Sequence, residues 1–266
     1  MTPVKLICCK ILFPVLFCMG FLLTASKSTA QGNKNLPYQL NIQFVDKDNS
    51  FNAEPLKLQK AFAGKVLCNA YIQGLTSLLS SKGYPTASVD SIFENENATT
   101  IHMFLGKQYQ WIKLKPAGIE KAAMDDSRFR EKDYEGKLLN IQQLLALQDK
   151  LLIYYEKNGY PFAEVFLDSI RLDDNKMDAL LRAKRGPLYH VDSIRVLGKA
   201  KISKKFLRHY LGISNGSLYN KEKLDLVSKR LLELPYLQEI QPADVTMLGS
   251  GSILNLYLAP KRSSQA

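Results

Sequence analysis

Histidine is nearly absent from this sequence, and the few histidines stand far apart. His102, His190 and His209 are the only three in the 266 residues. None has a second ligand nearby at the spacing of a metal site. The histidines therefore indicate surface or packing roles, and the sequence predicts no metal centre.

Cysteine is equally scarce. Of the four cysteines, Cys8, Cys9 and Cys18 lie near the start, and Cys68 is the one further along the chain. A lone cysteine forms no internal disulfide, and without a second cysteine to share a site it is typical of a small buried apolar side chain. The sequence thus predicts neither a disulfide framework nor a catalytic thiol.

The motifs of other active sites are missing as well. Two pairs of neighbouring carboxylates, Asp125-Asp126 and Asp173-Asp174, are predicted to lie in polar turns, where aspartate is favoured by turn geometry. Gly249-Ser250-Gly251 lacks the following helix with a basic residue that a phosphate-binding loop requires. No residues support a hydrolase, so we expect a protein that is not an enzyme and uses no cofactor.

The first thirty residues differ in character from the rest. Two lysines precede an apolar run at residues 11–23, and the small residues Ser28-Thr29-Ala30 stand before Gln31. The apolar run of about thirteen residues is shorter than the roughly twenty that span a bilayer, and the whole order is typical of a secretory signal peptide. We predict a signal peptide over residues 1–30, cleaved after Ala30.

Positive charge dominates the sequence, with a formal net charge of +11. Removal of the signal peptide would take away Lys5, Lys10 and Lys27, which leaves 11 − 3 = +8. A basic protein suits an anionic membrane surface as a further partner, and export argues against nucleic acid. The basic residues are scattered along the chain, so we interpret most of them as solvated surface.

What the sequence does contain is an internal repeat. Residues 82–89, Lys-Gly-Tyr-Pro-Thr-Ala-Ser-Val, and 158–165, Asn-Gly-Tyr-Pro-Phe-Ala-Glu-Val, are near copies 76 residues apart. A further 76 residues lead to Tyr236, which follows a proline but lacks the glycine. An amphipathic run precedes each glycine and an alternating run follows each proline, which predicts a helix, a tight corner and a strand. The predicted structural corners are formed by Gly83, Tyr84, Pro85, Gly159, Tyr160, Pro161 and Tyr236.

A period of this length predicts three small units in tandem, which are marginal alone and gain stability from their neighbours. We place the units at residues 36–107, 108–186 and 187–261, followed by a tail at 262–266. Each unit is predicted to contain a strand, two helices and two further strands. In the first unit, these are a strand at 38–45, a helix at 54–62, a helix after Gly64, and strands at 86–93 and 99–105.

The later units are predicted to follow the same order. The expected strands are 110–114, 162–172, 177–184, 191–196, 238–248 and 252–258, with helices capped by Asn140, Ser203 and Asn220. The glycine before each long helix stands 20, 24 and 20 residues ahead of the corner tyrosine. The difference of four is close to one helical turn, which predicts that the helix of the second unit is longer by one turn.

The tandem order, the predicted export, the helices ending in Gly-Tyr-Pro-x-Ala-x-Val and the Gly-x-x-Tyr starts at Gly106 and Gly186 together resemble POTRA domains. These are the periplasmic modules of outer-membrane barrel assembly and translocation factors, the BamA and TamA relatives. The resemblance covers about residues 36–261. It implies an α+β fold in which each unit is a small mixed three-stranded sheet with two helices on one face.

The resemblance also implies a function. We expect a periplasmic protein-interaction array that receives or guides unfolded or nascent outer-membrane proteins, with localisation in the periplasm at the outer membrane. The expected mechanism is β-augmentation, because an open sheet leaves an edge strand whose backbone can pair with an extended client. The expected client-binding edges are the strands after the corners, represented by Thr86, Ser88, Asp90, Phe162, Glu164 and Phe166.

Two further expectations concern partners. The array is expected to act with an outer-membrane barrel, either continuing from the same chain or supplied by another, and with periplasmic or lipoprotein accessory subunits. The alternative is a periplasmic scaffold that docks a partner subunit of an envelope or divisome-like complex. The sequence leaves this choice open.

Overall fold

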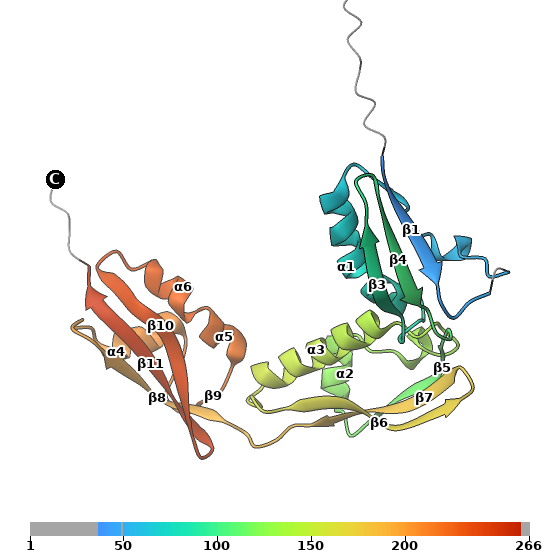
Figure 1. Cartoon of the computed structure of the whole chain (residues 1–266). Helices are drawn as coiled ribbons and strands as arrows, with labels where there is room; N and C mark the ends of the chain where they lie inside the picture. Colours follow the sequence, from blue (N-terminus) through green and yellow to red (C-terminus); the bar gives the residue numbers. More distant parts are fainter. Residues whose placement is uncertain (1–36, 49, 262–266) are drawn as a thin grey trace, which may run out of the picture. The chain divides into compact units, whose positions relative to one another are not determined.

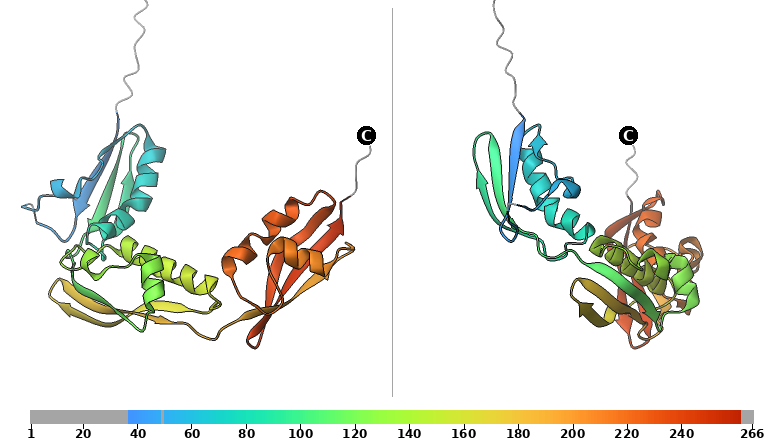
Figure 2. Two further views of the ribbon diagram at one scale, coloured as in Figure 1. Left: turned by 180° about the vertical axis from the view of Figure 1, so that it is seen from behind. Right: turned by 90° about the vertical axis from the view of Figure 1, so that its right-hand side faces the viewer.

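The computed structural model describes residues 37–48 and 50–261, and the predicted signal peptide and tail lie outside these ranges. The described chain forms three β-sheets, each with its own cluster of buried side chains (Figure 1). We call the segments that form them the first, second and third repeats. In each repeat the helices cover one face of the sheet and leave the other face open (Figure 2).

The first repeat is built on a sheet with the strand order β2-β1-β4-β3, in which β1 and β4 are parallel and β3 and β4 antiparallel. Its elements are β1 (Tyr38–Phe44), η1 (Glu54–Leu56), β2 (Ala61–Phe62), α1 (Lys65–Ser81), β3 (Ser88–Glu94) and β4 (Ala98–Phe104).

The helix predicted at 54–62 is wrong, because only the short 3-10 turn η1 forms there. Pro55 occupies the start of η1, and Lys57 ends it in the left-handed conformation. The Leu40 amide then donates to the Lys60 carbonyl at 2.8 Å, which holds the following residues extended beside β1. The first repeat therefore has one α-helix where the sequence predicted two.

The second repeat has a three-stranded sheet, β5-β7-β6, and both expected helices. Its elements are β5 (Gln110–Ala117), α2 (Lys121–Ser127), η2 (Glu131–Asp133), α3 (Ile141–Lys157), β6 (Glu164–Asp173) and β7 (Lys176–Lys184). The predicted cap of α3 is confirmed, since Asn140 Oδ1 accepts from the Gln143 amide at 3.0 Å. Asp125 and Asp126 lie within α2 and not in a polar turn.

The third repeat has the strand order β10-β11-β8-β9. The Ser203 and Asn220 caps are confirmed by bonds from the Phe206 and Lys223 amides. The second helix is divided at Leu226 into two short segments. Its elements are β8 (His190–Leu197), α4 (Lys204–Leu211), β9 (Ser217–Leu218), α5 (Lys221–Asp225), α6 (Val227–Leu232), β10 (Leu237–Leu248) and β11 (Gly251–Pro260).

The prediction that the second repeat has the longer helix is wrong. Helices α1 and α3 each contain 17 residues. Gly64 is the N-cap of α1, whereas Gly136 and Gly216 precede the short extended segments that pair with the first strand of their sheets. Because the three glycines are not equivalent, the spacing from glycine to tyrosine does not measure helix length. The helix before the corner is shortest in the third repeat, where α5 and α6 take its place.

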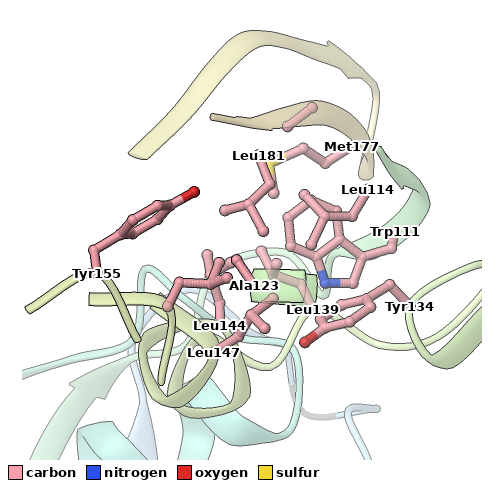
Figure 3. Close-up of a cluster of buried hydrophobic side chains, with 12 residues drawn as sticks. Trp111, Leu114, Ala123, Tyr134, Leu139, Leu144, Leu147, Tyr155, Met177 and Leu181 are labelled. Atoms are coloured by element: carbon pink, nitrogen blue, oxygen red, sulfur yellow. The ribbon is translucent and has the colours of Figure 1, made fainter. Parts of the chain in front are cut away.

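Each repeat buries one apolar stripe of its helices against alternate residues of its sheet. In the second repeat, Trp111 and Leu181 from the strands and Leu151 and Tyr155 from α3 are at most 2 % exposed. Figure 3 shows the sheet and helix side chains of this cluster pointing toward one another. Cys68 is fully buried in the cluster of the first repeat, as predicted for a small apolar side chain.

Candidate interaction surfaces: repeat corners and strand edges

The glycine of the repeated corner accepts a backbone hydrogen bond from the repeat that follows. The Gly83 carbonyl accepts from the Tyr109 amide at 2.7 Å, and the Gly159 carbonyl accepts from the Tyr189 amide at 2.8 Å. Both glycines have positive φ, +91° and +95°, which L-residues rarely adopt. A Cβ at Gly83 would also lie 3.0 Å from the Tyr109 carbonyl oxygen, a backbone atom. Glycine is required here by conformation and by close approach.

The tyrosine of the corner closes the helix end. The Tyr84 amide donates to the Leu79 carbonyl and the Tyr160 amide to the Tyr155 carbonyl, both at 3.0 Å. Both tyrosine rings are partly buried against the core of their repeat. The Arg185 guanidinium lies 5.4 Å from the centroid of the Tyr160 ring. The corners therefore join a helix, a strand and the start of the next repeat.

The same Arg185 also takes part in a polar network with α3. Its Nη1 atom lies 2.9 Å from Oε1 of Glu120, whose Oε2 atom accepts a 2.5 Å hydrogen bond from the Tyr155 hydroxyl. Burial, followed by this bond to a carboxylate, raises the pKa of Tyr155 well above its usual range. The hydroxyl therefore stays a donor at any physiological pH.

The third corner is built differently. Tyr236 is 51 % exposed, while Leu234 and Leu237 fill the core on either side of it. No glycine precedes this tyrosine, and the Tyr236 carbonyl accepts from the Lys261 amide at 3.0 Å. The position predicted as a corner contact from the 76-residue period is thus a largely exposed side chain.

A carboxylate holds the end of the first repeat, just before the second repeat begins. Asp46, just after β1, accepts from the Leu105 amide at 2.8 Å and the Gly106 amide at 2.9 Å, and Lys47 Nζ lies 2.8 Å from its Oδ2 atom. Burial raises the pKa of the Asp46 carboxyl, but these hydrogen bonds and the lysine outweigh it and leave the pKa below its usual value. The carboxylate form is therefore favoured by the folded state.

In each sheet, the strand that follows the corner lies at one end of the strand order and pairs with one neighbour only. These outer strands are β3, β6 and β10, at the ends of the three strand orders. Every one has a register shift: at Val89/Ser91 in β3, at Asp168/Arg171 in β6, and twice between Glu239 and Asp244 in β10. Such bulges bend and twist an edge, which limits pairing with long flat strands of other molecules.

The predicted client-binding residues divide into two groups. Ser88 and Asp90 lie on β3, and Glu164 and Phe166 lie on β6. Thr86 and Phe162 lie in the turns ahead of these strands, where they pack against the backbone of Gly106 and Gly186 at the start of the next repeat. The strands begin two residues later than predicted, because the turn after each proline is needed to reach that junction.

The side chains of Glu164 and Phe166 are held by the neighbouring strand β7. Lys184 Nζ lies 4.0 Å from the Glu164 carboxylate and 5.0 Å from the centroid of the Phe166 ring. Asp168 forms an ion pair with Arg182 in the same way. These pairs are exposed and worth about 0.2–1 kcal/mol each. They hold the side chains on the open face of the sheet and do not involve the backbone of β6.

The backbone of β6 alternates between pairing with β7 and facing outward. Asp173 and Lys176 flank a two-residue loop and so form a hydrogen-bonded pair, which directs the Leu172 amide outward. The Val165 carbonyl points outward too, since it accepts from Gln148 Nε2 at 3.1 Å. The backbone groups that face away from β7 at this edge thus belong to every second residue of the strand, and not to Glu164 and Phe166 themselves.

Exposed apolar side chains accompany all three outer strands, and the predictions from sequence missed them. Each strand has two that are at least half exposed. They are Ile92 (50 %) and Phe93 (55 %), Ile170 (52 %) and Leu172 (59 %), and Ile240 (63 %) and Leu248 (54 %). The neighbouring pair Ile92-Phe93 could have revealed one of them from the sequence. Adjacent strand residues point to opposite faces of the sheet, so one side chain of the pair cannot face the core.

The first repeat has an additional groove where the predicted helix is missing. It has a volume of about 330 Å³ and is lined by the apolar residues Ile42, Phe44, Ala53 and Leu58 and by the charged residues Glu54, Lys57 and Lys60. The Gln39 and Val45 amides donate toward β4, so the alternate residues Ile42 and Phe44 direct their amides to the other side, into the groove. The groove thus combines apolar and charged walls with a strand edge.

The described residues contain no group of three or more His, Cys, Asp or Glu side chains able to hold a metal ion. His102, His190 and His209 lie on β4, at the start of β8 and on α4. Among the same residues, no helix is long and apolar enough to cross a membrane.

Comparison with known proteins supports the sequence resemblance. The POTRA family model, described as a surface antigen variable number repeat, matches residues 189–258. The structure of BamA POTRA3–5 from Haemophilus influenzae is similar at 15 % identity, covering 84 % of this chain and 96 % of that chain with a TM-score of 0.55. No curated protein sequence matches the chain.

Two other structures are similar at lower TM-scores. BamA from Haemophilus ducreyi lacking POTRA domains 1–3 has 14 % identity, covers 57 % of this chain and 30 % of that chain, and gives a TM-score of 0.45. POTRA1–3 of the periplasmic domain of Omp85 from Anabaena has 11 % identity, covers 86 % and 96 %, and gives 0.36. The predicted α+β fold of tandem POTRA-like units is confirmed by the BamA POTRA3–5 match.

Proposed function

Because residues 189–258 match the POTRA family and the described chain has the fold of a POTRA array, we propose that this protein binds extended polypeptide segments at its outer strand edges. The proposed clients are unfolded or nascent outer-membrane proteins. The proposed location is the periplasmic side of the outer membrane, beside a barrel and its accessory subunits. The array divides into units at residues 36–107, 108–186 and 187–261 in this proposal.

One observation carries the proposal: an unpaired strand edge accompanied by two exposed apolar side chains recurs in all three repeats. Backbone groups of an edge supply affinity for any extended chain, and neighbouring apolar side chains add contact with alternate client residues. Such recognition has little sequence selectivity. It therefore suits a receptor for many clients that share an extended, apolar character before they fold.

Site-specific photocrosslinking in cells tests this function. A photoreactive residue replaces Leu172 on β6, and a matched control replaces Ile153, which is similarly exposed (53 %) but lies on α3. We expect adducts with outer-membrane proteins from position 172 and few from position 153. Equal adducts at both positions would count against edge binding. Adducts confined to cell-division or envelope-scaffold subunits would instead favour the alternative, a docking scaffold.

Backbone pairing can be separated from apolar contact at the same residue. Leu172→Pro removes an outward amide without touching the ladder to β7, whereas Leu172→Ala keeps the amide and removes the exposed side chain. Augmentation predicts that proline weakens binding of an unfolded outer-membrane protein more than alanine does. If both variants weaken binding equally, the client is held by contact with the apolar side chain and not by backbone pairing.

A further inference from the structure

The third repeat contains a long stretch with positive charge only. Residues 193–220 include six basic side chains and no aspartate or glutamate. The six are Arg195, Lys199, Lys201, Lys204, Lys205 and Arg208. The interpretation that the basic residues of the chain are scattered is therefore wrong for this repeat.

The fold gathers five lysines at one end of the third repeat. Strands β8 and β11 are parallel, with Leu197 beside Tyr257, so their carboxyl ends meet. The Ala200 amide donates to the Leu258 carbonyl at 3.1 Å, which holds the connection from β8 to α4 against the end of β11. We define the basic end as five exposed lysines, Lys199 and Lys201 in this connection, Lys204 and Lys205 in the first turn of α4, and Lys261 after β11.

These lysines are not neutralised within the described chain. None of them forms an ion pair with any carboxylate of residues 37–48 or 50–261. The corresponding helix of the second repeat, α2, differs because it follows Glu120 and includes Asp125 and Asp126. The charge of the basic end is therefore a property of the third repeat and not of the fold.

An exposed aromatic ring accompanies the lysines. Phe206, on the first turn and a half of α4, is 40 % exposed and stacks on Tyr210 with a centroid distance of 5.6 Å. A partly exposed phenyl ring that follows two lysines in the same helix fits the boundary between lipid headgroups and acyl chains. The basic end as defined contains lysines only. Each ammonium group acts as a point charge and, unlike the guanidinium of arginine, offers no bidentate fork for a particular carboxylate or phosphate.

We propose that the basic end binds the surface of an anionic phospholipid bilayer, with Phe206 entering the interface. Each lysine near such a surface contributes through its attraction to the negative surface potential, which decays within a Debye length. The apolar ring adds a contact that a soluble polyanion does not offer. This binding is independent of the strand edges, so client binding and membrane binding are separable activities of one chain.

Vesicle co-sedimentation with the purified exported protein tests the proposal. The vesicles are phosphatidylcholine alone and phosphatidylcholine with about one third phosphatidylglycerol. We expect binding to the anionic vesicles to fall steeply with added salt. Lys204→Ala/Lys205→Ala should lower partitioning about 25-fold at low salt, roughly fivefold for each lysine. Unchanged partitioning in a variant with the parent unfolding midpoint would overturn the proposal.

The control variant is Lys121→Ala/Lys132→Ala, which removes the same charge from exposed positions in and after α2. Its partitioning should match the parent, and an equal loss would show a response to net charge alone. Phe206→Ala should lower vesicle binding about threefold to fivefold but leave binding to a DNA duplex of matched charge unchanged. Duplex binding as tight as vesicle binding, with no effect of Phe206→Ala on the vesicles, would make the patch a general polyanion site and overturn the proposal.

Discussion

At the scale of single residues, the positions that most constrain this chain are those where backbone meets backbone. Gly83 and Gly159 lie at the corners, where a positive φ disfavours any side chain, and at Gly83 the Tyr109 carbonyl oxygen of the next repeat also leaves little room for one. Asp46 accepts from two amides at the end of the first repeat. None of these residues contributes apolar surface to a core, yet each holds elements together that are distant in sequence.

Gly83→Ala should destabilise the protein by about 2–4 kcal/mol, since it combines a positive φ with a Cβ 3.0 Å from the Tyr109 carbonyl oxygen, a backbone atom. The matched control is Gly136→Ala, with φ +65° and no atom within 4 Å of the added Cβ. That change should cost only the conformational part, about 1–2 kcal/mol. Urea unfolding of both variants measures the difference, and equal midpoints would show that the close approach is unimportant.

Asp46→Asn should destabilise the protein by about 1–2 kcal/mol at neutral pH, because the charge-assisted bonds to the Leu105 and Gly106 amides are weakened. The folded pKa of Asp46 is lowered, so its contribution is fully present above the unfolded pKa, near pH 4. It is lost as the pH falls through the folded pKa. The difference between parent and variant should therefore shrink on acidification, and a pH-independent difference in denaturant midpoint would contradict this account.

At the scale of elements, local signals predicted well and distant pairings did not. The caps at Asn140, Ser203 and Asn220 depend on neighbouring residues and are visible in the sequence. The loss of the helix at 54–62 depends on β1, because the Leu40 amide of this strand donates to the carbonyl of Lys60, about twenty residues away in sequence. The bulges of the outer strands depend on the register of a partner strand, so no local sequence pattern predicts them.

Deletion of Ser169 should convert β6 into a regular edge strand. Ser169 has a φ of 50° and lies in the three-residue step on β6 that faces a two-residue step on β7. A flatter edge with exposed Ile170 and Leu172 would pair with a second molecule. Sedimentation velocity should show concentration-dependent self-association beyond that of the parent. An unchanged sedimentation profile in a folded variant would show that the bulge does not protect the edge.

At the scale of the whole molecule, the sequence predicted three tandem units from one period, and the structure has three sheets with separate cores. It did not predict the basic end of the third repeat, because Lys199 and Lys261 are far apart in sequence and only the pairing of β8 with β11 brings them to one end. The sequence shows how charged residues are spaced along the chain. Which of them gather on one surface can be predicted only when the strand topology is known.

The signal peptide is also a property of the whole molecule, and it stays a prediction because residues 1–30 lie outside the described part. We expect the exported protein to begin at Gln31, since small residues precede this position and a short apolar run precedes them. Intact mass spectrometry of the exported form measures this directly. A mass that retains the apolar run would indicate a membrane-anchored form.

The hydrogen bond from one repeat to the corner glycine of the previous one has a consequence for how such chains diverge. Donor and acceptor are both main-chain atoms, at Tyr109 and Gly83 and again at Tyr189 and Gly159. Substitutions elsewhere cannot remove the donor unless they introduce proline, and they cannot remove the acceptor at all. Duplicated units can therefore drift apart in sequence, or be gained and lost, while the joint between them remains intact, provided that a single glycine is retained.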